Sequence, residues 1–138
     1  DVCEKQASGQ EKVAKAELDF RADGSESNRH KLAKAKADAD YDVAKEKCDD
    51  LSGNAKDVCT KDAKAAHVKA LEAAKVAEAR MEPNSNTASK QAHVADTRKE
   101  ADEKVREAEY KAAKERCDAM SGNAKDACVA DAKRKYAQ

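Results

Sequence analysis

Five cysteines are the residues whose type and spacing carry the clearest chemistry in this chain. Four of them close two copies of one box: residues 48–59 read Cys-Asp-Asp-Leu-Ser-Gly-Asn-Ala-Lys-Asp-Val-Cys, and residues 117–128 read Cys-Asp-Ala-Met-Ser-Gly-Asn-Ala-Lys-Asp-Ala-Cys. Cysteines paired in this way can form a disulfide, bind a metal or stay free. The boxes lack the Cys-x2-Cys or His-x3-His spacing of structural zinc sites, which favours disulfides. The predicted pairs are Cys48–Cys59 and Cys117–Cys128.

Each box is predicted to form the tip of an antiparallel helical hairpin. Gly53 and Gly122 can take the left-handed conformation at which a helix ends, and Asn54 and Asn123 are expected to cap the outgoing helices. Closing a loop this short with a disulfide should contribute on the order of 3 kcal/mol to stability. The incoming helices should bury a matching apolar face, which comprises Tyr41, Ala44, Cys48 and Leu51 in the first copy and Tyr110, Ala113, Cys117 and Met120 in the second.

Cys3 has no partner of this kind within the chain. Residues 1–3 repeat the Asp-Val-Cys of residues 57–59, so Cys3 matches the second cysteine of a hairpin whose first half is missing. Three explanations stay open: the chain was cut or processed upstream, Cys3 pairs with another chain, or it is a free thiol.

Histidines and carboxylates are the other candidates for chemistry. His30, His67 and His93 do not lie three or four residues from one another or from a cysteine, and we expect them to pack at the surface, with a shared metal site as the alternative. The carboxylates alternate with lysines, as on a solvated helix face. No Gly-rich phosphate loop, Gly-x-Ser-x-Gly elbow or His-Glu-x-x-His motif occurs. We therefore predict no catalytic residue, cofactor or metal, and no enzymatic activity.

Composition restricts the partners and the compartment. The 28 basic and 28 acidic residues balance, and without a basic face we expect no binding of nucleic acid. No apolar run approaches the roughly 20 residues of a membrane span. Paired cysteines indicate an oxidising compartment, either the periplasm or the cell exterior.

Alanine accounts for 31 residues and isoleucine is absent, which favours long, closely packed helices. We predict an all-α fold, an elongated up-and-down array of antiparallel helical hairpins with each tip closed by a disulfide. Its parts are a half-hairpin helix and turn (1–28) and two stapled hairpins (29–82 and 83–138). The breaks fall at 22–28 and at the only proline, within Glu82-Pro83-Asn84-Ser85-Asn86. In the helix after the first box, the predicted packing stripe is Cys59, Ala63, Ala66, Ala70, Ala73 and Ala77, and a second stripe should face another helix.

The repeated box, set in Lys/Ala/Glu-rich helices, resembles a group of uncharacterised secreted or periplasmic bacterial proteins with Cys-x10-Cys hairpins. The helices are also loosely similar to the helical domain of TolA-type envelope proteins. The resemblance implies a periplasmic or extracellular location and supplies no catalytic residues.

The hypothesis that fits these observations is a non-enzymatic structural or interaction protein of the bacterial cell envelope or exterior. Its expected partner is itself, as a homo-oligomer or filament, or another envelope protein. Head-to-tail contact through residues 1–21 is one route to a filament. The alternative is a helical module that binds a metal or small ligand.

Overall fold

The computed structural model describes residues 1–83 and 86–138, which form five helices joined by short turns. The predicted residues Asn84 and Ser85 of the central turn lie outside the described residues. The helices are α1 (Val2–Ala22), α2 (Glu26–Cys48), α3 (Gly53–Met81), α4 (Thr87–Cys117) and α5 (Gly122–Tyr136).

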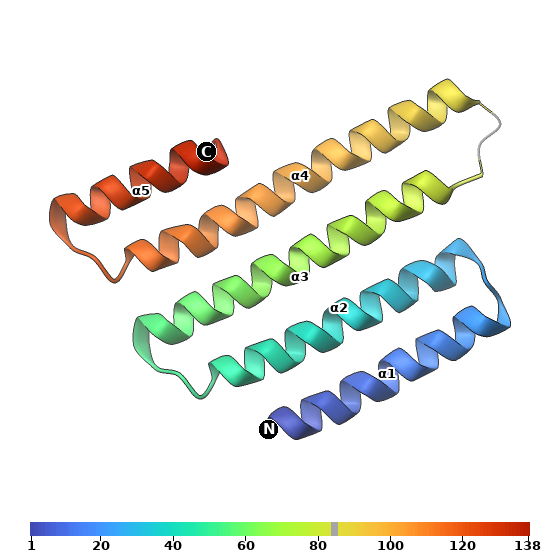
Figure 1. The fold of residues 1–138 in the computed structure, drawn as a ribbon, viewed down its shortest axis with the longest axis horizontal. Coiled ribbons are helices and arrows are strands. Elements are labelled where there is room, and N and C mark those ends of the chain that lie inside the picture. The colour runs from blue at the N-terminus through green and yellow to red at the C-terminus, as the bar shows by residue number, and fades with distance from the viewer. Residues whose placement is uncertain (84–85) are drawn as a thin grey trace.

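The five helices lie side by side in chain order, in one layer (Figure 1). Within the described residues, each helix contacts only the helix before it and the helix after it. The two stapled turns lie at one end of the layer and the other two turns at the opposite end (Figure 1). At 1.5 Å per residue the 31 residues of α4 span about 47 Å. The predicted all-α, up-and-down array with disulfide-closed tips is therefore confirmed.

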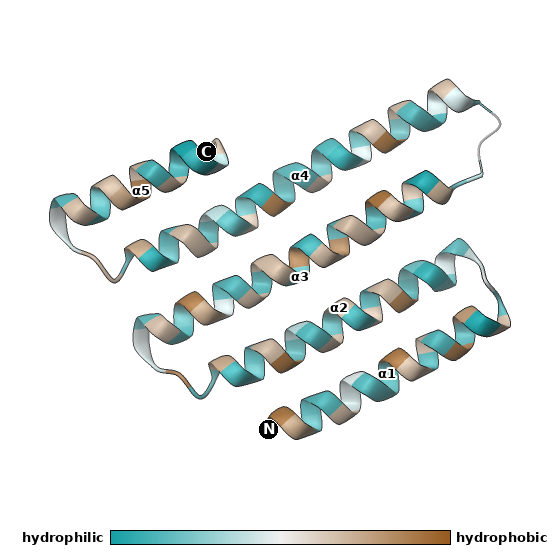
Figure 2. Cartoon of the chain, in the orientation of Figure 1, coloured by the Kyte–Doolittle hydropathy of each residue, from teal (hydrophilic) through white to brown (hydrophobic). Residues whose placement is uncertain are grey.

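A single layer of helices leaves little volume for a core. Among the residues that the structure describes, the side chains of Cys48 and Cys117 are fully buried, and the other buried hydrophobic residues are all alanines. Figure 2 shows hydrophobic residues scattered along every helix instead of gathering in one centre. With so little apolar surface to bury, the disulfides carry a large share of the stability.

The predicted alanine stripe of α3 is largely wrong as a packing surface. Ala66, Ala70, Ala73 and Ala77 are exposed. The contacts of α3 with α2 are instead made by residues spaced along the whole of α3. Cys59 bonds to Cys48, His67 contacts Asp38, and Glu78 contacts His30. Ala66, Ala73 and Ala77 line open grooves beside α4 and are not covered by it.

Leu51 and Met120 also depart from the prediction. Each was expected on the buried face of an incoming helix, yet they are 44% and 47% exposed. The reason is that α2 and α4 end at Cys48 and Cys117, before these residues are reached. Leu51 and Met120 therefore lie in the tips, as equivalent exposed apolar side chains.

Helices α1 and α2 pack closely at Gly9. A Cβ placed on Gly9 would lie 2.8 Å from the Cβ of Ala39, which is shorter than any normal contact. Gly9 is buried, and its missing side chain allows the two helices to approach each other. This contact gives the mid-helix glycine a packing role.

Across the layer, α3 and α4 are joined by a buried carboxylate. Glu72 on α3 is only 6% exposed. Its Oε1 lies 2.6 Å from Nζ of Lys75 on the same helix, and its Oε2 lies 3.6 Å from Nζ of Lys104 on α4. The pairing compensates part of the cost of burying a charged group.

Candidate functional site

Both predicted disulfides are present. The Cα atoms of Cys48 and Cys59 are 5.6 Å apart, and those of Cys117 and Cys128 are 5.7 Å apart. These separations fall within the range that a disulfide requires. The sulfur atoms therefore hold α2 to α3 and α4 to α5.

Sequence reasoning missed an ion pair that both tips repeat. Lys56 lies 2.7 Å from Asp49 in the first tip, and Lys125 lies 2.8 Å from Asp118 in the second. The hydrogen bond from each lysine lowers the pKa of its aspartate below the ordinary value. The signal was present in the box, since an aspartate follows the first cysteine and a lysine precedes the second by three residues in both copies.

The glycines of the boxes adopt the predicted left-handed conformation, with φ of 55° at both Gly53 and Gly122. The predicted cap at Asn54 is wrong, because α3 begins at Gly53 and its N-cap residue is Ser52. The N-cap of α5 is likewise Ser121, so Asn123 is not the cap either.

The side chain of Asn54 instead makes a contact between the two hairpins. Its Nδ2 donates a hydrogen bond of 3.0 Å to the backbone carbonyl of Glu115, in the last turn of α4. This bond links the first stapled tip directly to the second hairpin. Asn123, its equivalent in the second box, is exposed and makes no side-chain hydrogen bond with any described residue.

Cys3 is exposed and unpaired in the single chain. It lies in the first turn of α1, whose N-cap is Asp1. Pairing of Cys3 with another chain stays a prediction.

The structure separates the three histidines and gives each one a carboxylate. His67 on α3 lies 2.7 Å from Oδ1 of Asp38 on α2, and its ring stacks on Tyr41 at a centroid distance of 4.6 Å. Burial raises the pKa of Asp38, but hydrogen bonds from Lys34 and His67 outweigh burial and leave the pKa below its ordinary value. Together these contacts fasten α2 to α3.

The other two histidines do not join this cluster. Nδ1 of His30 lies 3.0 Å from Glu78, and Nε2 of His93 lies 3.5 Å from Glu82. Within residues 1–83 and 86–138, no group of three or more His, Cys, Asp or Glu side chains is placed to hold a metal ion. In the same residues, no helix combines the length and the hydropathy of a membrane span.

The chain matches no protein-family model, no curated protein and no solved structure. Its function therefore has to be inferred from its own contacts and surfaces.

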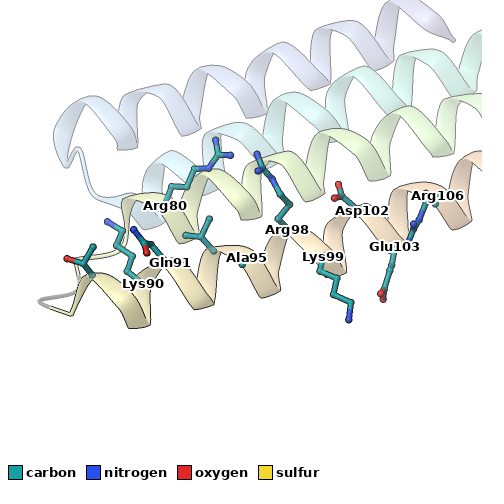
Figure 3. A pocket seen from close by; sticks show the side chains of 11 residues that line it. Arg80, Lys90, Gln91, Ala95, Arg98, Lys99, Asp102, Glu103 and Arg106 are labelled. Atoms are coloured by element: carbon teal, nitrogen blue, oxygen red, sulfur yellow. The ribbon is translucent and has the colours of Figure 1, made fainter.

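A groove lined mainly by cationic side chains runs along α4 near the turn that follows α3. It has a volume of about 680 Å³ and is lined by one face of α4 together with Arg80 of α3. Five cationic and two carboxylate side chains line it, although the whole chain is neutral. In Figure 3 the side chains of Arg80 and Arg98 project to the same side of the α3–α4 seam, whereas Lys99 and Glu103 point away from it. Sequence reasoning missed this groove because the balanced total charge hides a local surplus.

Proposed function

We propose that this chain is a non-enzymatic structural or interaction protein that associates with itself. The proposed setting is an oxidising compartment, the bacterial periplasm or cell exterior. Two disulfides are compatible with such a compartment, and the resemblance of the repeated box to secreted helical proteins supports the finer location.

One observation carries the proposal: a frame held by disulfides presents an exposed apolar side chain at the equivalent position of both tips, at one end of the layer. Leu51 and Met120 occupy equivalent positions in the two tips, and both are exposed. The tips lie at the same end of the layer (Figure 1). A disulfide and an ion pair hold each tip. A rigid surface loses little conformational entropy when it binds, so a contact made there is favoured.

The proposed contact joins the stapled end of one chain to a second copy. Sedimentation velocity over a hundredfold range of concentration tests it. The wild-type protein should shift to larger species as its concentration rises, and a Leu51→Ser/Met120→Ser variant should remain monomeric at the same concentrations.

Met81→Ser provides the matched control, because Met81 is 47% exposed, as Met120 is, but lies at the last residue of α3, away from the stapled tips. The control should associate as the wild-type protein does. A wild-type protein that stays monomeric at every concentration, under both oxidising and reducing conditions, would remove self-association from the proposal.

A further inference from the structure

We propose that the groove on α4 is a binding site for an aliphatic phosphate, meaning a phosphate group carried on a non-aromatic, partly apolar body. The inference goes beyond the proposed scaffold, because it gives this surface a small ligand. Three observations support it: the arginines of the groove lack ion-pair partners in the described part of the chain, two of them project to the same side, and the floor of the groove is partly apolar.

The first observation is that the arginines of the groove have no carboxylate partner. The side chains of Arg80, Arg98 and Arg106 make no ion pair or hydrogen bond with any residue in 1–83 and 86–138. By contrast, Arg29 pairs with Glu26, Arg116 with Asp62 and Arg134 with Asp131. The chain has seven arginines, and the remaining one, Arg21, also has no such partner among the described residues but lies outside the groove. The unpaired guanidinium groups are thus concentrated at one place.

The second observation is their placement. Arg80 and Arg98 come from adjacent helices and project to the same side of the seam (Figure 3). Two like charges on one rim repel each other, and an anion between them would remove that repulsion. The planar guanidinium fork matches the geometry of a phosphate, with two parallel hydrogen bonds from each arginine. Arg106 follows Arg98 by two helical turns, about 12 Å further along α4.

The floor of the groove indicates what carries the phosphate. Val94 and Ala95 lie along it, together with the methylene stems of the lysines and arginines. No aromatic side chain lines the groove, so it offers no platform on which a nucleotide base could stack. The volume of about 680 Å³ lies in the range of sites for small organic ligands. These features favour an aliphatic body.

The test uses the full chain and three soluble probes: monomeric dihexanoyl phosphatidic acid, dihexanoyl phosphatidylcholine and inorganic phosphate. Titrations are followed by the backbone and arginine Nε–H signals in nuclear magnetic resonance. Phosphatidic acid should produce saturable shifts at Arg80 and along residues 94–106. It should bind about tenfold or more tightly than either other probe, because only it combines the phosphate monoester with an apolar body.

Two charge-matched double variants decide whether the arginines of the groove are responsible. Arg80→Gln/Arg98→Gln should weaken phosphatidic acid binding about tenfold or more, since each lost arginine removes charged hydrogen bonds. Arg21→Gln/Arg134→Gln removes the same charge elsewhere and should bind within about twofold of wild type. All four side chains are exposed, and circular dichroism should show unchanged helicity in both variants.

Three results would overturn the proposal: equal weakening in the two double variants, shifts that map outside the groove, or no saturable shift at millimolar phosphatidic acid. Sedimentation with phosphatidylcholine vesicles containing phosphatidic acid then identifies the source of the phosphate. Vesicle binding that only the groove variant loses supports a lipid headgroup in a membrane. Binding of the soluble probe without vesicle binding supports a free ligand.

Discussion

Removal of the second disulfide should release α5 from an otherwise folded protein. In a Cys117→Ala/Cys128→Ala variant, the lost constraint acts on a loop with a sequence separation of 11. The chain-entropy relation for that length gives a stabilisation of about 2.8 kcal/mol at 25 °C. The first disulfide has the same separation, so the same figure applies to a Cys48→Ala/Cys59→Ala variant.

The two variants should nevertheless behave differently. Of the other helices, α5 contacts only α4, and with 15 residues it is at the length where an isolated helix is marginal in water. Without its disulfide, α5 should unfold locally, and its amide hydrogens should exchange about a hundredfold faster. By contrast, α3 packs against both α2 and α4, so loss of the first disulfide should lower the global stability instead.

Native-state hydrogen exchange and urea unfolding measure these two effects. Cys3→Ala is the control, because Cys3 is exposed and has no partner, and its unfolding free energy should stay within about 0.5 kcal/mol of wild type. The reasoning is refuted if the amides of α5 keep their wild-type protection in the second variant. It also fails if both variants lose the same global stability with no local change in α5.

Three further predictions concern single contacts. Asn54→Ala should destabilise the fold by about 1 kcal/mol in urea unfolding, because the variant loses a hydrogen bond between hairpins. Asn123→Ala should change the unfolding free energy by less than about 0.5 kcal/mol, and equal effects of the two variants would contradict the role assigned to Asn54. Because the pKa of Asp38 is lowered in the fold, its ionised form stabilises the protein above the ordinary carboxyl pKa of about 3.9, and this contribution is lost as the pH falls through the lower folded value. The melting temperature advantage of wild type over Asp38→Asn should therefore shrink below about pH 4, and an advantage that is constant down to pH 2 would refute this. Gly9→Ala should lower the unfolding free energy by about 1 to 2 kcal/mol despite alanine's better helix propensity, because the new Cβ would clash with Ala39. Adding Ala39→Gly should recover part of this loss. A Gly9→Ala variant more stable than wild type would contradict the close contact between α1 and α2.

The disulfides and the hairpin order could be predicted because their signals are local. The boxes at 48–59 and 117–128 place two cysteines around a short turn, and the helical composition on both sides leaves one simple way to pair them. Helix ends were harder to place. Leu51 and Met120 continue an apolar spacing from the preceding helix, yet the helices stop at the cysteines, and spacing alone does not show where a helix ends.

The contacts between helices that sequence reasoning missed are non-local. The bond from Asn54 to Glu115 joins residues far apart in the chain, and the approach of Gly9 to Ala39 depends on the partner helix. Alanine also gives a weak signal, since it favours a helix whether it faces a neighbour or water. The spacing from Ala66 to Ala77 therefore predicts a packing surface that the fold does not form. The groove on α4 is not predictable from the sequence, because the spacing of arginines along one helix does not show which of them lack an ion-pair partner.

The restriction of contacts to consecutive helices has a consequence for how such a chain can change its size. A duplicated segment that adds one more stapled hairpin would extend the layer by two helices, and only the junctions at its two ends would need compatible side chains. The internal contacts of every existing hairpin would stay as they are. Proteins of this design can therefore gain or lose length through recombination without evolving a new core.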